Sequence, residues 1–165
     1  MSDEGATIEE QLLSACFTDQ PHLVSALLQQ TSKPFNINHK NGLGLTALHY
    51  AAQRESIECV KLLISVKGIK PNIQDNMDEN TPLHTALINC TSSETALEIA
   101  KLLISAGADP RIVNKDKKRP VNLTEPEEED IRTLLLQATL AIQVKDELAE
   151  QLEEEGEKQG YYSSD

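Results

Sequence analysis

The hydrophobic residues of this chain recur at intervals of three and four, in short runs that are separated by polar turns. Two such runs open the chain, one over residues 12–15 and one over residues 23–28. This spacing places the apolar side chains on one face of an amphipathic helix, so the pattern predicts short helices that follow one another in pairs. A similar stripe continues after Leu136 as far as Leu152 and predicts a last helix that runs to about Glu155.

Two segments of the chain repeat each other. Residues 46–51, TALHYA, match residues 81–86, TPLHTA, at an offset of 35, and residues 58–65, ECVKLLIS, match residues 98–105, EIAKLLIS, at an offset of 40. The five extra residues of the second segment fall in the polar stretch 89–95, so we expect them in the connection between its two helices. Self-similarity at this period is typical of solenoids, in which stacked units bury apolar faces that no unit can bury alone.

The repeated motif resembles the ankyrin repeat. The resemblance rests on Thr-Pro-Leu-His at 81–84, an alanine pair at 51–52, Leu-Leu pairs at 62–63 and 102–103, and Gly-Ala-Asp at 107–109. It covers residues 8–136 and implies an all-α fold: an ankyrin-repeat solenoid of stacked helix pairs with short hairpin loops, in about four units of which two are degenerate caps. Taken whole, the chain is similar to small, functionally undefined ankyrin-repeat proteins of fungi with an acidic C-terminus, on residues 5–6, 10–13, 107–111 and 120–121.

The repeats and the charge divide the chain into three parts. We expect a flexible N-terminal segment at 1–6, an ankyrin-repeat domain at 7–142, and an acidic C-terminal segment at 143–165 that is helical to about Glu155 and disordered from Gly156. Within the repeat domain the expected units are 7–38, 39–73, 74–113 and 114–142. The first and last units depart from the pattern because their outer faces meet water, and RPVN at 119–122 replaces TPLH in the last.

The resemblance also implies which residues bind a partner. Ankyrin-repeat proteins usually bind through their concave side, which is made of the hairpin tips and the exposed face of each first helix. The residues at these places are Leu43, Leu45, Tyr50, Gln53 and Arg54 in the second unit, Met77, Asp78, Asn80, Thr85, Ile88 and Asn89 in the third, and Lys115, Asp116 and Lys118 in the fourth.

The apolar members of this set form a possible centre of an interface with charge on either side, which is the usual anatomy of a protein-binding surface. They are Leu43, Leu45, Tyr50 and Met77. The alternative is that the two leucines pack on the neighbouring hairpin. Glu79 and Lys117 stand where the family has a glycine at the hairpin tip, so we expect those two hairpins to have a different shape.

The negative charge is concentrated at the end of the chain. Residues 125–165 hold 13 acidic and 3 basic side chains, a net charge of −10 out of −12 for the whole protein. Such a segment repels nucleic acid, which we therefore exclude as a partner. An alternative function is a chaperone or assembly escort for a basic client, such as a ribosomal protein or a histone, and a kinase-inhibitor-like role would share the same architecture.

Several features favour a cytoplasmic and/or nuclear protein. The longest apolar runs are a few residues, as at 134–136, far short of the ~18 residues that a membrane-spanning helix needs. The first basic residue is Lys33 and no apolar stretch follows the N-terminus, so we expect no secretory address. An odd number of widely spaced cysteines, Cys16, Cys59 and Cys90, fits reduced thiols.

The sequence offers no catalytic motif, and we expect neither enzymatic activity nor a cofactor, a metal or a small-molecule substrate. His49 and His84 occupy the same place in successive repeats. Stacked helices lie about 8–10 Å apart, whereas both ligands of one zinc ion must come within ~2 Å of it. We therefore expect each histidine to bond the backbone of the turn, and we expect a monomer that binds one partner protein.

Overall fold

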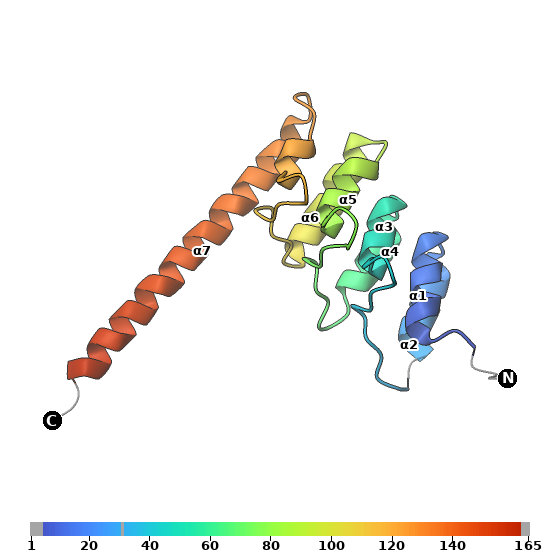
Figure 1. Cartoon of the computed structure of the whole chain (residues 1–165), viewed down its shortest axis with the longest axis horizontal. Helices are drawn as coiled ribbons and strands as arrows, with labels where there is room; N and C mark the ends of the chain where they lie inside the picture. Colours follow the sequence, from blue (N-terminus) through green and yellow to red (C-terminus); the bar gives the residue numbers. More distant parts are fainter. Residues whose placement is uncertain (1–4, 31, 163–165) are drawn as a thin grey trace.

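The computed structural model describes residues 5–30 and 32–162, and helices are the regular secondary structure of that part of the chain (Figure 1). The elements are α1 (Ile8–Phe17), α2 (Pro21–Gln30), α3 (Ala47–Gln53), α4 (Ile57–Ile64), α5 (Pro82–Asn89), α6 (Ser93–Ser105), the 3-10 helix η1 (Pro120–Leu123) and α7 (Glu129–Tyr162). The all-α fold predicted from the sequence is confirmed. Each expected unit holds one pair of these elements, and the last unit pairs η1 with the start of α7.

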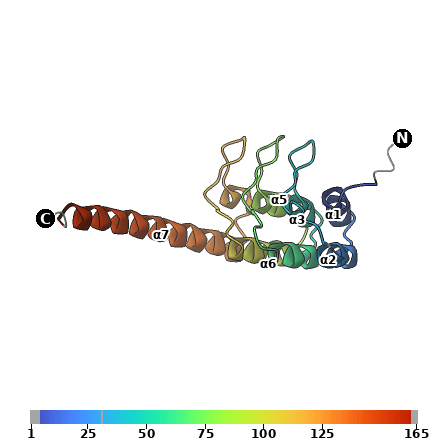
Figure 2. The ribbon, with the colours of Figure 1, turned by 90° about the horizontal axis from the view of Figure 1, so that it is seen from below.

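The helices form two parallel rows. The inner row is α1, α3, α5 and η1, each in contact with the next, and the outer row is α2, α4, α6 and the first turns of α7. Figure 2 shows three hairpin loops that project from the inner row on the side away from the outer row. This arrangement is a solenoid of stacked helix pairs, as the repeats predicted.

Small side chains in the inner row and larger ones in the outer row make the core. Ala51, Ala52 and Ala86 of the inner helices are fully buried, which lets neighbouring helices approach closely. Val60 and Leu103 of the outer helices fill the space between the rows and are also fully buried. Because every unit shares its apolar face with its neighbours, stability comes from stacking.

Threonine caps begin the inner helices. Thr7, Thr46 and Thr81 each accept a hydrogen bond from the backbone N–H three residues later, which satisfies one free donor of the helix end. In α1 the partner in this capping box is Glu10, which is the usual residue type. In α3 and α5 the partner is a histidine.

These two histidines join successive units. Nδ1 of His49 accepts from the backbone N–H of Thr46 at 3.1 Å, and its Nε2 donates to the backbone carbonyl of Asn80 in the next unit at 2.9 Å. His84 repeats the pattern, with Nε2 lying 3.0 Å from the carbonyl of Lys118. The pattern requires the neutral imidazole, and burial lowers the pKa of both rings below the ordinary value of 6.5. The prediction that these histidines bond the turn backbone is confirmed.

One side chain closes each hairpin from within. Asn41, Asp75 and Asn114 each accept two backbone N–H bonds of their own loop through a side-chain oxygen. A backbone bond then joins residue 41 to residue 45 and residue 114 to residue 118. In the third unit the bond joins residues 75 and 80, so that loop is one residue longer.

The hairpin tips share one backbone conformation. Gly44, Glu79 and Lys117 have φ angles of 79°, 56° and 62°, all in the left-handed region. The absence of a tip glycine therefore leaves the backbone conformation at this position unchanged. The expectation of a different hairpin shape is wrong for the loop of Lys117, whereas the loop of Glu79 does differ, by its one additional residue. Gly44 is required for a second reason, because an added Cβ would lie 2.7 Å from the backbone nitrogen of Asn76 in the next hairpin.

The extra residues of the third unit lie in a helix. We expected them in the connection between α5 and α6, but α6 begins at Ser93 and is 13 residues long, against 8 for α4. The side chain of Ser92 caps this added turn. Thr91 donates from its backbone N–H and its hydroxyl to Glu55 of the second unit, so the short connection is tied to its neighbour.

The last helix is longer than predicted. It was expected to end near Glu155 with a disordered tail from Gly156, but α7 continues to Tyr162, and only residues 163–165 of that tail lie outside the described part. Ile131 and Leu135 are buried against the stack, and the C-terminal part of the helix projects away from it (Figure 1). Of the N-terminal segment expected at 1–6, residues 5 and 6 are described, and both are exposed coil.

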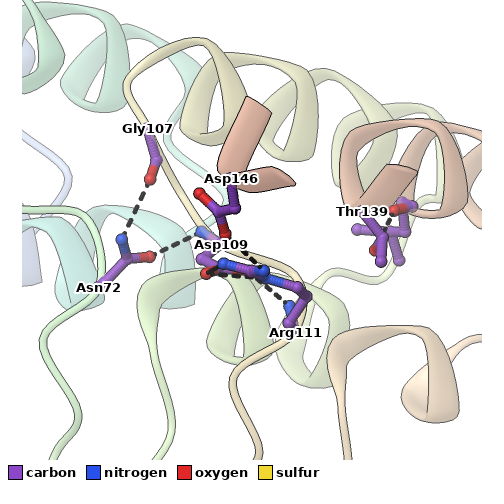
Figure 3. A network of polar contacts seen from close by, with 7 residues as sticks. Asn72, Gly107, Asp109, Arg111, Thr139 and Asp146 are labelled. Atoms are coloured by element: carbon purple, nitrogen blue, oxygen red, sulfur yellow. Dashed lines mark hydrogen bonds and ion pairs between the residues drawn. The ribbon is translucent and has the colours of Figure 1, made fainter. Parts of the chain in front are cut away.

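A polar network fixes the direction of α7 where it leaves the stack (Figure 3). Arg111 forms an ion pair of 3.0 Å with Asp146 of α7 and another of 2.9 Å with Asp109. The amide of Asn72 holds the same corner, because it donates to the carbonyl of Gly107 and accepts from the N–H of Asp109. Hydrogen bonds from the Arg111 guanidinium lower the pKa of Asp109, so this corner stays charged at neutral pH.

Replacing the two kinds of tip residue should change the stability by different amounts. Gly44→Ala places a Cβ against the next hairpin at a positive φ, so we expect a loss of about 1–3 kcal/mol in the free energy of unfolding. Lys117→Gly relieves a left-handed side chain at a similar cost in chain entropy, so the free energy should stay within about 1 kcal/mol. Urea denaturation measures both, and equal losses would contradict this assignment.

The buried neutral histidines predict a stability that depends on pH. Their pKa values are lowered in the folded state, so the stabilisation is complete above pH 6.5 and is lost as the pH falls below it. The free energy of unfolding should fall by up to about 1.4 kcal/mol per pH unit for each histidine. His49→Gln should remove about half of this slope, as measured by urea denaturation between pH 7.5 and 5.5. An unchanged slope would show that other groups control the pH dependence.

Candidate protein-binding surface

The surface considered first is the concave face, which we define as the three hairpins 41–45, 75–80 and 114–118 together with the exposed sides of α1, α3 and α5. Most of the residues expected there are exposed. They are Leu43, Gln53, Arg54, Met77, Asp78, Ile88, Asn89, Lys115, Asp116 and Lys118. Leu45 and Tyr50 are half-buried.

Two residues that we expected on the binding surface are buried instead, so the expectation is wrong for them. Asn80 is buried because its carbonyl accepts from His49 and its side-chain oxygen accepts from Asn114. Thr85 is buried within α5, where its hydroxyl donates to the carbonyl of Thr81. Asn80 thus joins neighbouring units, whereas the Thr85 hydroxyl is satisfied within its own helix.

An aromatic and cationic cluster lies at the N-terminal end of the concave face. The rings of Phe17 and Tyr50 meet edge to face, with centroids 5.3 Å apart and planes at 79°. The guanidinium carbon of Arg54 lies 4.3 Å from the centroid of the Phe17 ring. Both geometries are favourable for aromatic and cation–π contacts. The side chains are held in place before any partner arrives.

Phe17 was missed by the sequence analysis. It is the last residue of α1, and its side chain is 44% exposed, which is high for a residue of its size. The degenerate first unit lacks the motif from which the other candidates were read. A signal was nevertheless present, because one of only two phenylalanines of the chain stands directly before the polar turn that follows α1.

Phe17 and Tyr50 of this cluster line a shallow depression of about 260 Å³. Leu13 and Phe17 supply apolar walls, and Ser14, Asn41 and Tyr50 supply hydroxyl and amide groups. Asn41 donates to the Tyr50 hydroxyl at 2.7 Å, which ties the depression to the first hairpin. The arrangement suits an apolar side chain of a partner, with Arg54 beside it for a carboxylate or a carbonyl oxygen.

The hairpin tips add a second group of exposed side chains. Leu43 is 49% exposed and Met77 is 56% exposed, at the tips of two hairpins whose backbones bond to each other through the Leu43 carbonyl and the Asn76 N–H. The Lys115 N–H donates to the Asp78 carbonyl and joins the third hairpin to the second. The tips thus form one continuous edge with apolar residues at one end and mixed charge at the other.

The described residues contain no group of three or more His, Cys, Asp or Glu side chains placed to hold a metal ion. Cys16 and Cys59 are buried free thiols, and Cys90 is a partly buried one. None of the helices in the described part of the chain combines the length and the apolar character needed to cross a membrane.

Comparison with known proteins identifies the repeat. The family model described as ankyrin repeats (3 copies) matches residues 12–115. The chain belongs to the ankyrin-repeat family. Ankyrin repeats are generally protein–protein interaction modules, and the stacked pairs and projecting hairpins seen here follow from that membership.

Relatives differ in how much of their length this ankyrin chain spans. Ankyrin repeat-containing protein YGL242C of Saccharomyces cerevisiae is 35% identical over 152 residues, which cover 86% of this chain and 83% of the yeast protein. Protein phosphatase 1 regulatory subunit 27 of Mus musculus is 39% identical over 53% of each chain. NF-kappa-B inhibitor zeta of Bos taurus is 33% identical over 56% of this chain and 13% of its own length.

Proposed function

We propose that this protein is a non-enzymatic protein–protein interaction module that binds one partner protein on its concave ankyrin face. The observation that carries the proposal is the exposed cluster of Phe17, Tyr50 and Arg54. Tyrosine and arginine are enriched among the residues that dominate binding energy, and such residues lie near the centre of an interface. Here they are held by contacts within the protein, so binding costs little side-chain entropy.

The rest of the concave face adds apolar area and a charged rim around this cluster. Leu43 and Met77 extend the apolar area along the hairpin edge, and Asp78, Lys115 and Lys118 form a charged rim. Interfaces with an apolar centre and a polar rim are typical of specific partner binding. The names of two relatives, a phosphatase regulatory subunit and an inhibitor, describe proteins that act on another protein.

We infer that the protein works as a monomer in the cytoplasm, the nucleus or both. The first pair, α1 and α2, and the last pair, η1 and α7, each pack on the neighbouring unit of the same chain. Terminal units with an exposed outer face are what allows a solenoid to remain a single chain. Sedimentation measurements and imaging of a fluorescently tagged chain examine the two parts of this inference separately.

Truncating the cluster should remove partner binding and leave the fold intact. Phe17→Ala and Tyr50→Ala each delete an exposed or half-exposed aromatic ring, so we expect each to weaken partner binding by about tenfold or more. Partners captured by affinity purification are identified by quantitative mass spectrometry, with far-UV circular dichroism as the check on folding. Lys101→Ala, an exposed position on the outer helix α6, is the matched control and should capture the same partners. Unchanged capture by both aromatic variants would refute the concave-face proposal.

A second candidate function is an escort for a basic client, favoured by the exposure of the acidic end of α7. Residues 143–158 hold seven acidic and two basic side chains, and every one of these residues is exposed. Among the described residues, Asp146 is the one acid of this stretch in a salt bridge. The remaining carboxylates are available to neutralise the lysines and arginines of a ribosomal protein or a histone.

The escort candidate predicts binding that depends steeply on salt, because exposed charges are screened over ~8 Å at physiological ionic strength. Replacing the five glutamates Glu150, Glu153, Glu154, Glu155 and Glu157 by glutamine removes five charges and keeps Asp146 and its ion pair. We expect this variant to lose binding of a purified histone by more than tenfold at 0.15 M salt, as measured by fluorescence anisotropy. Equal affinity of the variant and the native chain would exclude the escort function.

A further inference from the structure

The exposed half of α7 carries a row of large apolar side chains. Leu136, Leu140, Val144, Leu148 and Leu152 follow one another at intervals of four residues, and their exposed fractions lie between 53% and 68%. We call these five residues the α7 row. Large exposed side chains are unremarkable singly, whereas a continuous apolar surface on a soluble protein marks a site of contact.

The row lies away from the side of α7 that docks on the stack. Ile131 and Leu135 face the stack and are buried. Four residues advance an α-helix by about 400°, so each member of the row stands one turn further on and about 40° further round. The row therefore follows one ridge of the helix, and the exposed fractions of its members show that no other element of the described structure covers it.

This part of α7 buries none of its described side chains against the stack. From Gln143 to Gln159 every residue is exposed, and the Arg111–Asp146 ion pair is the salt bridge that joins this stretch to the rest of the described chain. Isolated helices of about this length are marginal in water, and most helices gain their stability by packing an apolar face. A helix that presents a continuous apolar row here is suited to stabilisation by a partner.

The charge beside the row selects the kind of partner. Glu147 and Glu155 lie three residues after Val144 and Leu152, and so stand beside them on the next turn. A second copy of this chain would set net charges of −5 from residues 143–158 against each other. An anionic membrane surface is disfavoured for the same reason. A helix with an apolar face and basic flanks is complementary to both the apolar row and the acidic side chains beside it.

We propose that the α7 row is a docking site for a basic amphipathic helix of another protein. The leucines and Val144 pack against the apolar face of that helix, and the flanking glutamates pair with its lysines or arginines. Packing of i, i+4 ridges on both helices sets a crossing angle near −50°, so the contact covers about three turns, from Val144 to Leu152. This surface is separate from the concave face, and it shares with the escort candidate the basic nature of its partner.

The test uses the full chain and a labelled synthetic peptide of 18 residues with leucine at intervals of three and four and lysine elsewhere. A second peptide has the same composition in an order that gives no apolar face, so it carries the same charge. Fluorescence anisotropy at 0.15 M salt should show at least tenfold tighter binding of the amphipathic peptide. The triple variant Val144→Gln, Leu148→Gln, Leu152→Gln should lose this preference while circular dichroism shows an unchanged helix content.

Control variants separate the α7 row from other surfaces. Glu150→Gln changes an exposed residue on the opposite side of α7, two residues from both Leu148 and Leu152, and Tyr50→Ala changes the concave face, so both should keep the native chain's preference for the amphipathic peptide. Equal binding of the two peptides would overturn the docking proposal and leave the escort candidate, which needs charge alone. A dimer in sedimentation experiments that the triple variant abolishes would also overturn it, because a second copy would then cover the row.

Discussion

The contact between successive units is the constraint on which the whole structure depends. No helix pair buries its apolar face alone, and the fully buried alanines of α3 and α5 bring each unit close to the next. The two histidines orient this contact through hydrogen bonds. In each ring one nitrogen bonds the backbone at the start of its own helix, and the other bonds a carbonyl of the following hairpin. The hairpins then stand side by side through backbone bonds, and the concave face is built on that edge.

The fold, the helix caps and the role of the two histidines could be predicted from the motif TPLH and its repeat, because these features are local and recur with a fixed spacing. The added turn of α6 was misread as a loop, because Ser92 and Thr95 look like a polar connection and act as a cap. The extension of α7 past Gly156 was also missed, since glycine is a poor helix former and the high net charge of this segment favours disorder. Asn80 was placed on the surface because its hydrogen bonds to His49 and Asn114 join residues far apart in sequence, and Thr85 because the packing of α5 that buries it is not visible in the motif. The Phe17 cluster depends on the same kind of long-range contact.

The protein thus presents two surfaces of different character. The concave face is rigid, nearly neutral and anchored by aromatic rings that the fold already holds in place. The free half of α7 is acidic and apolar on one ridge, and it is joined to the stack by Ile131, Leu135 and the Arg111–Asp146 pair. A partner with a folded body and a basic helix could occupy both surfaces, and linkage of two weak contacts would raise the overall affinity without any new contact.

The most direct test of the central claim is hydrogen–deuterium exchange of the full chain with and without its captured partner. Recognition by the concave face predicts that the partner slows exchange in the hairpins at 41–45 and 75–80 and at the C-terminal end of α1, while the exposed side of α2, α4 and α6 is unchanged. Protection confined to the outer row, with free exchange in the hairpins, would contradict the account.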